Sequence, residues 1–130
     1  MLRLIYQSKG ANNMALISDA IGPAGRGDGD FQVWGERIIV RDGKTSLGTS
    51  EGTIAGSVIT MRDALENIIS LGTPAEEAIR MASLVPARIA GIERHYGSIE
   101  NGKRADLIVL DDDLRVRMAI LGGAIALDAG

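Results

Sequence analysis

Short apolar runs along this chain are separated by glycine-containing turns, and an early run ends in an acidic residue. The run Met14–Ser18 is too short for a typical helix and follows two asparagines, which favours a strand buried on both faces. Such strands belong mostly to parallel sheets, and Asp19 stands at the carboxyl end of this run, before a loop of glycine and proline. Enzymes with parallel sheets place catalytic groups at that end of their strands. Asp19 is therefore a candidate catalytic residue, and the start of an ordinary turn is the alternative.

A helix is expected before this run, and a small antiparallel sheet after it. Apolar residues at helical spacing, followed by Lys9, predict a helix near the amino end that stops at Gly10. Asp42 and Gly43 are typical of a hairpin turn. Three strands are expected around this turn, over Phe31–Val33, Arg37–Val40 and Lys44–Leu47.

The middle of the chain predicts three helices in close succession. A second glycine-containing loop, Glu51–Ser57, leads into the first of them. Thr60 and Asp63 have the spacing of a capping box, and Thr73 before Pro74 predicts another helix start with the threonine as its cap. The expected extents are residues 60–71, 74–83 and 86–89.

The last third of the chain returns to strand patterns. Asn101 and Gly102 predict a hairpin turn between Gly97–Ile99 and Asp106–Leu110. A closing hairpin is expected from Val116 to Leu127, with a turn at two glycines. Strands and helices together predict an α/β protein.

Composition excludes several classes of function. The 130 residues are 45% hydrophobic, so disorder is not expected, and a formal net charge of -3 argues against a nucleic-acid partner or an anionic membrane surface. The absence of cysteine excludes disulfides and thiolate metal sites. Neither a signal peptide nor a membrane-spanning run is recognised, which makes a cytoplasmic location the expectation.

Other patterns carry weaker signals. His95 is the only histidine and is expected to be a partly exposed turn residue without a metal role. The tripeptide Arg26–Asp28 matches a cell-adhesion signal by chance, and the glycines around it fit neither a calcium loop nor a nucleotide loop. Asp111–Asp113 is expected to be a solvated turn.

Four phrases of the sequence occur in an informative order. They are LISDAIGPAG (Leu16–Gly25), EGTIAGSVITM (Glu51–Met61), ASLVPARIAGI (Ala82–Ile92) and GSIENGKRADLIVLDDD (Gly97–Asp113). With them, the chain resembles the carboxyl-terminal part of the N-acetylglucosamine-6-phosphate deacetylases, a family of the amidohydrolase superfamily. The last two phrases are widespread in the superfamily, whereas the first two are much more specific to the deacetylases.

The resemblance implies a fold class: a carboxyl-terminal fragment of a (β/α)8 barrel, containing the last barrel strand and helices, plus part of a small flanking β-sandwich domain. Residues 1–97 would be the barrel part, with a β-hairpin insertion near 31–48, and residues 98–130 the β-domain part. A complete barrel of this type takes about 250 residues, so most of it would lie outside this chain.

The resemblance also implies metal-dependent hydrolysis of the acetamide of N-acetylglucosamine 6-phosphate to glucosamine 6-phosphate and acetate. Asp19 would take a proton from a metal-bound water and pass it to the departing amine. The divalent metal, zinc or similar, would be held by ligands absent from this chain, with Asp19 adjacent to it. Ile54, Ala55 and Gly56 would contact the substrate.

Two hypotheses follow. In the first, the chain is part of a longer enzyme, dimeric like the family, and is inactive alone. In the second, it is a non-catalytic remnant that acts as an assembly or interaction module, because an unpaired strand and uncovered apolar helix faces need partners.

Overall fold

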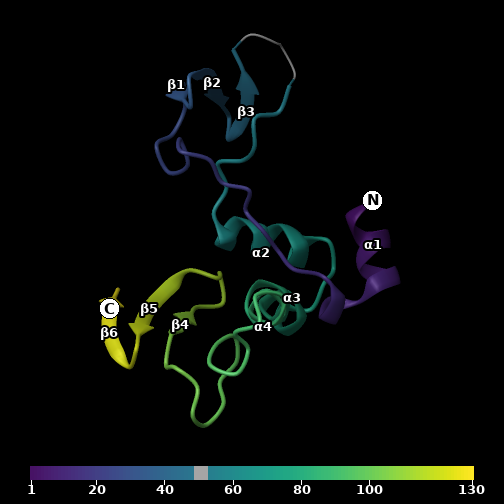
Figure 1. The fold of residues 1–130 in the computed structure, drawn as a ribbon, viewed down its shortest axis with the longest axis vertical. Helices are drawn as coiled ribbons and strands as arrows, with labels where there is room; N and C mark the ends of the chain where they lie inside the picture. The colour runs from purple at the N-terminus through teal and green to yellow at the C-terminus, as the bar shows by residue number, and fades with distance from the viewer. Residues whose placement is uncertain (49–52) are drawn as a thin grey trace. The chain divides into compact units, whose positions relative to one another are not determined.

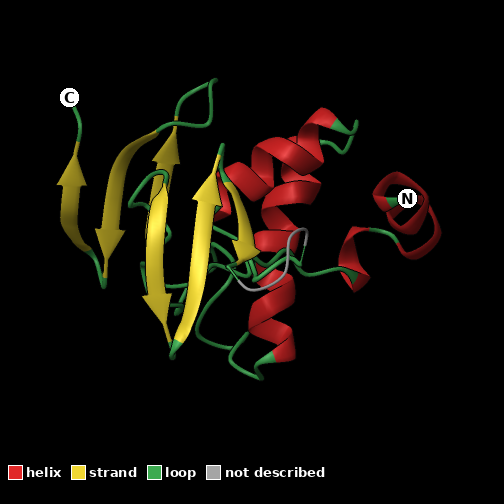
Figure 2. Cartoon of the chain, turned by 90° about the horizontal axis from the view of Figure 1, so that it is seen from above, coloured by secondary structure: helices red, strands yellow, loops and turns green. Residues whose placement is uncertain are grey.

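The computed structural model describes residues 1–48 and 53–130, and its chain divides into two compact units. Unit 1 contains residues 1–16 and 65–130, and unit 2 contains residues 17–64. Figure 1 labels the elements, and Figure 2 distinguishes helices from strands. Each unit has one three-stranded antiparallel sheet, β1-β2-β3 in unit 2 and β4-β5-β6 in unit 1.

Unit 2 is built on the predicted hairpins. Its strands are β1 (Gly29–Val33), β2 (Glu36–Arg41) and β3 (Lys44–Leu47). Asp42 and Gly43 both have positive φ angles, 50° and 69°, as a tight turn between antiparallel strands requires. The hairpin prediction is confirmed.

The sheet of unit 2 buries one face and carries charges on the other. Ile38 and Val40 are buried on β2. Arg37 and Arg41 both form ion pairs with Asp30 of β1, and the hydrogen bond from Arg37, followed by that from Arg41, lowers the pKa of the Asp30 carboxyl. These exposed pairs join neighbouring strands without adding much stability.

Unit 1 is built around a small helical core. Its helices are α1 (Leu2–Lys9), a 3₁₀ turn η1 (Ala11–Asn13), α3 (Ala75–Ala82) and α4 (Leu84–Ile89). The core contains Ala11, Leu65, Ile68, Ala78 and Met81. The buried helical residues are three positions apart, Leu65 with Ile68 and Ala78 with Met81, which places each pair on one helix face.

Two long-range hydrogen bonds attach the amino-terminal segment to α3. The Tyr6 hydroxyl donates to the Glu77 carboxylate at 2.7 Å, and the Leu16 N–H donates to the Met81 carbonyl at 2.9 Å. Gly10 ends α1 with φ 72°, as predicted.

Helix α2 (Met61–Ser70) starts with the predicted capping box, and the boundary between the units falls within this helix. The Thr60 N–H donates to the Asp63 carboxylate at 2.7 Å, and the Asp63 N–H donates to the Thr60 hydroxyl at 3.2 Å. Helix α3 differs from the prediction by one residue: Pro74 is its cap position, and no side-chain hydrogen bond caps it.

The carboxyl-terminal sheet is partly different from the prediction. Its strands are β4 (Leu107–Leu110), β5 (Val116–Leu121) and β6 (Ala124–Asp128). The closing hairpin is confirmed, but the strand expected over residues 97–99 is wrong, since β4 pairs with β5 instead. A Cβ at Gly97 would lie 2.7 Å from the Ala87 Cβ, so residue 97 packs against α4.

The strand predicted over Met14–Ser18 is also not observed. These residues, all within the described part of the chain, have no strand assignment, and Ile17 is 74% exposed rather than buried. A parallel strand takes its hydrogen bonds from neighbours distant in sequence. Here the nearest parallel pairing is a single bridge between Ala20 and Ser57, just after the predicted strand.

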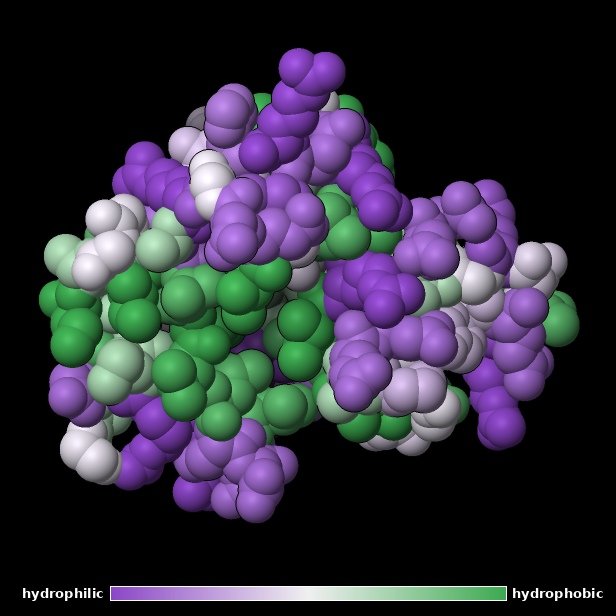
Figure 3. All heavy atoms as spheres, turned by 90° about the horizontal axis from the view of Figure 1, so that it is seen from below, coloured by the Kyte–Doolittle hydropathy of each residue, from purple (hydrophilic) through white to green (hydrophobic). Residues whose placement is uncertain are grey.

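Hydrophobic side chains gather on one face shown in Figure 3, where they form a green patch. The large exposed apolar residues of the carboxyl-terminal sheet are Ile108, Val109, Leu121, Ile125 and Leu127. No helix in the described ranges is long and apolar enough to cross a membrane.

Candidate active site

Two segments of unit 2 that are far apart in sequence lie side by side at Asp19. The Ser57 N–H donates to the Asp19 carbonyl at 2.8 Å, and the Ile21 N–H donates to the Ser57 carbonyl at 2.9 Å. This pair of bonds forms the parallel bridge between Ala20 and Ser57. The first and second glycine-containing loops are therefore joined at the residue that sequence analysis selected.

Gly56 lies close to both Asp19 and Ile21, and a side chain at residue 56 would clash with Ile21. A Cβ at residue 56 would be 2.7 Å from the Ile21 Cγ2, 3.3 Å from the Asp19 carbonyl oxygen and 3.7 Å from the Asp19 Oδ2. Gly56 also has φ 94°, a backbone conformation that other residues rarely adopt. Both the space and the backbone angle require glycine here.

Asp19 itself has a left-handed backbone, with φ 51°. Aspartate is one of the few residues with a side chain that tolerate this conformation. Its side chain is exposed. The arrangement therefore places an exposed carboxylate next to the glycine backbone of the second loop.

The hairpin of unit 2 holds the second loop in place. Thr45 of β3 is 7% exposed, and its hydroxyl donates a 2.6 Å hydrogen bond to the Gly56 carbonyl. The Leu47 N–H donates to the Thr53 carbonyl at 3.0 Å. Sequence analysis missed Thr45, because a strand threonine carries no local sign of a partner eleven residues away.

The three residues expected to contact substrate are placed differently. Ile54 and Gly56 line a cavity of about 420 Å³ together with Lys44, Thr45 and two neighbours. Ile54 is 79% exposed, whereas Ala55 is half-buried and does not line this cavity. Their substrate contacts stay a prediction, as does the catalytic role of Asp19.

The described residues do not by themselves fit a metal ion. Within residues 1–48 and 53–130, no group of three histidine, cysteine, aspartate or glutamate side chains is placed to hold one. One carboxylate supplies too few ligands for a zinc or similar site. His95 lies exposed in a turn, where its backbone N–H donates to the Ile92 carbonyl.

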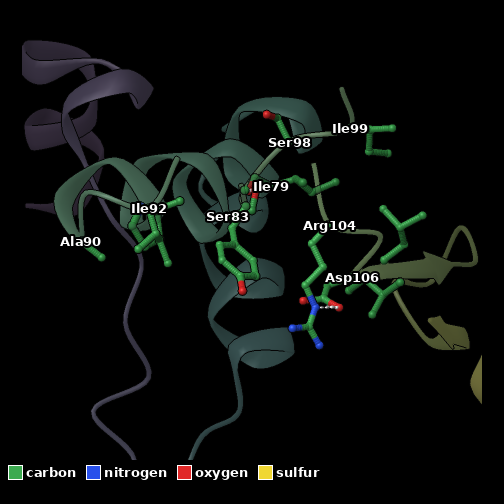
Figure 4. Close-up of a pocket in the computed structure, with 14 residues that line it drawn as sticks. Ile79, Ser83, Ala90, Ile92, Ser98, Ile99, Arg104 and Asp106 are labelled. Atoms are coloured by element: carbon green, nitrogen blue, oxygen red, sulfur yellow. Dashed lines mark hydrogen bonds and ion pairs between the residues drawn. The ribbon is translucent and has the colours of Figure 1, made fainter. Parts of the chain in front are cut away.

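A larger cavity lies in unit 1 and contains none of the predicted site residues. Its volume is about 540 Å³, and residues of α3, α4 and β4 line it, mostly with apolar side chains (Figure 4). Arg104 and Asp106 form an ion pair at its edge, 3.0 Å long. The Gly122 N–H, and after it Arg104, lower the pKa of the Asp106 carboxyl.

The candidate site is thus an exposed carboxylate beside glycine backbone in a mixed α/β chain. Residues 27–126 match the Amidohydrolase family, and the chain belongs to this family. The predicted resemblance is thereby confirmed at the level of the family, a family of hydrolases.

Several relatives carry deacetylase names. The chain is 38% identical over 114 residues to a "Putative N-acetylgalactosamine-6-phosphate deacetylase" of Escherichia coli (strain K12), covering 87% of this chain and 67% of that protein. It is 32% identical over 125 residues to the N-acetylglucosamine-6-phosphate deacetylase of Bos taurus, covering 95% of this chain but 30% of the relative. The alignment thus spans less than a third of the bovine protein.

Solved structures show the same likeness. The N-acetylglucosamine-6-phosphate deacetylase of Pasteurella multocida matches with a TM-score of 0.90 and 32% identity, over 98% of this chain and 33% of that one. The enzyme of that name from Thermotoga maritima matches with a TM-score of 0.90 and 33% identity, over 98% and 35%. The fold is therefore that of about one third of these proteins.

Proposed function

We propose that this chain is the carboxyl-terminal part of an enzyme that hydrolyses the acetamide of an amino-sugar 6-phosphate. N-acetylglucosamine 6-phosphate is the proposed substrate, and glucosamine 6-phosphate and acetate are the products. The observation that carries the proposal is the contact between Asp19 and Gly56, in a chain similar to deacetylases. Met14–Ser18 would become the last strand of a (β/α)8 barrel once neighbouring strands supply its hydrogen bonds.

Asp19 is proposed to move the proton in this reaction. Water adds to the acetyl carbon, the bond between that carbon and the sugar nitrogen breaks, and the nitrogen needs a proton to leave as an amine. An exposed carboxylate accepts the proton from the attacking water and returns it to the nitrogen. Gly56 presents backbone without a side chain next to this carboxylate, and the acetyl group is proposed to bind there.

The remaining parts of the site belong to residues outside this chain in this proposal. The divalent metal of the family would have its ligands there, because the described residues do not form a metal site. The chain alone would therefore be inactive, and the complete enzyme would be a cytoplasmic dimer. Residues 1–97 would belong to the barrel and residues 98–130 to the small β domain.

The test starts from the genomic DNA upstream of Met1. The longest in-frame protein is expressed, and acetate release is measured from N-acetylglucosamine 6-phosphate and from its galactosamine counterpart, with and without added zinc. We expect metal-dependent release by the longer protein and none by the 130-residue chain. A folded longer protein that releases no acetate from either sugar would contradict the proposal.

A second candidate is a non-catalytic assembly module. The observation in its favour is the exposed apolar side chains of the carboxyl-terminal sheet, including Ile108 and Ile125. A promoter directly upstream of Met1, with no barrel sequence in frame, would favour this function over the first.

A further inference from the structure

We propose that Thr45 is a positioning residue for the candidate active site, acting through the Gly56 carbonyl on the backbone beside Asp19. The inference rests on the proposed function for its catalytic consequence. Its structural part, a link from the β-hairpin to the second loop, stands on the geometry of unit 2 alone.

Thr45 is a fixed donor. It lies within β3 and pairs in register with Val40 of β2, whose side chain is 2% exposed. Thr45 itself is 7% exposed, so water does not readily replace its hydroxyl as a partner of the Gly56 carbonyl. The bond length of 2.6 Å is at the short end for a hydroxyl donor.

The Gly56 carbonyl belongs to the peptide group that bonds to Asp19. That carbonyl and the Ser57 N–H belong to the same planar peptide group, so they turn together. The Ser57 N–H is the donor to the Asp19 carbonyl. A rotation of this peptide that broke the bond from Thr45 would therefore also turn the donor away from Asp19.

The position of Gly56 also affects the surroundings of the Asp19 carboxylate. The position that a Cβ would occupy on Gly56 is 3.7 Å from the Asp19 Oδ2, so the glycine forms one wall of the space around the carboxylate. The role assigned to Thr45 is to hold Gly56 in this position, not to touch the reacting atoms. The nearby Ser57 hydroxyl has a different partner, the Ile59 N–H at 2.9 Å.

The first measurement uses the 130-residue chain and needs no activity. Amide hydrogen exchange is followed by NMR at Ser57 and Ile21 in the chain and in Thr45→Val, which keeps the size of the side chain but removes the donor. We expect the Ser57 amide to exchange about tenfold faster in this variant, the effect of losing one hydrogen bond of ordinary strength. Thr45→Ser, which keeps the hydroxyl, should restore the slow exchange.

Ser46→Ala is the matched control, because it removes a hydroxyl from the next residue of the same strand, whose side chain points to the opposite face. Its Ser57 exchange should equal that of the parent chain. If Thr45→Val does not fold, Thr45→Cys replaces it, since a thiol of similar size is a weak donor. Unchanged exchange at Ser57 in a folded Thr45→Val or Thr45→Cys chain would overturn the positioning role.

The second measurement uses the longer protein in which acetate release is assayed. Thr45→Val should lower kcat about tenfold with KM within about threefold, because a displaced Asp19 impairs proton transfer more than binding. Thr45→Ser should recover kcat. Faster Ser57 exchange together with an unchanged kcat would overturn the catalytic consequence. A parent protein without activity would refute the proposed function, but the exchange result would still test the positioning role.

Discussion

Asp19 borders the position that a Cβ on Gly56 would occupy. A Cβ on Gly56 would lie 3.7 Å from the Asp19 Oδ2 and 3.3 Å from the Asp19 carbonyl oxygen. The contact joins two loops separated by the whole β-hairpin. It makes the second loop part of the surroundings of the candidate catalytic residue.

Gly56→Ala is expected to destabilise unit 2 by about 3 kcal/mol, because the new methyl group meets Ile21 at 2.7 Å on a backbone with φ 94°. Gly35→Ala is the matched control: Gly35 has φ 85° but no atom within 4 Å of the added carbon. It should cost about 1 kcal/mol, from the backbone angle alone. Urea unfolding of both variants measures the difference in the free energy of unfolding. Equal losses of stability would show that the contact with Ile21 and Asp19 is not tight.

Asp19→Asn is expected to abolish acetate release by the longer protein while leaving substrate binding nearly unchanged. The amide keeps the shape of the side chain but does not accept the proton that the proposed reaction transfers. Turnover is measured by acetate release and binding by calorimetry with N-acetylglucosamine 6-phosphate. Asp112→Asn, in an exposed turn, serves as the control. An active Asp19→Asn enzyme would refute the role given to Asp19.

Local turn and cap chemistry made much of this fold predictable. The stop of α1 at Gly10, the hairpin turn at Asp42 and the capping box at Thr60 are each specified by residues within a few positions of one another. Their conformations depend on backbone angles and short-range hydrogen bonds. Sequence patterns therefore located these elements to within a few residues.

Interactions between residues distant in sequence were harder to predict. The strand predicted over Met14–Ser18 lacks partners within this chain, and the hairpin expected at Gly97 is displaced by its packing against Ala87. Asp19 was identified from its place after an apolar run, but Thr45 was not, since its partner is distant in sequence. A side chain whose role depends on tertiary contact leaves no periodic or local sign.

The capping box of α2 should make stability depend on pH. Hydrogen bonds from the Thr60 backbone, and then from its hydroxyl, lower the pKa of the Asp63 carboxyl in the folded chain. The unfolded value is about 3.9, so the carboxylate stabilises the fold above that pH and loses this effect as pH falls through the folded pKa. Asp63→Asn should therefore be less stable than the parent chain at pH 6, with the difference shrinking below about pH 4.

Thermal unfolding followed by circular dichroism at pH 3 to 7 measures this difference. Other carboxyls with lowered pKa, such as Asp30 and Asp106, contribute equally to the parent and the variant and cancel in the comparison. A gap between parent and Asp63→Asn that stays constant down to pH 3 would show that the Asp63 carboxylate is not the stabilising form.

The carboxyl-terminal sheet predicts self-association of the 130-residue chain. Ile108, Ala119 and Leu127 lie opposite one another across β4, β5 and β6, so they share one face, and Ile108 and Leu127 are 59% and 49% exposed. Strand β6 is also an edge strand in the described sheet, and exposed apolar edges favour association between copies. Sedimentation should show species heavier than the 13.7 kDa monomer.

Leu127→Lys should shift the chain toward monomer, because it places a charge on this face. Trp34→Lys, at an exposed turn of the other sheet, is the control and should leave the distribution of species unchanged. A monodisperse monomer with cooperative thermal unfolding would contradict this prediction.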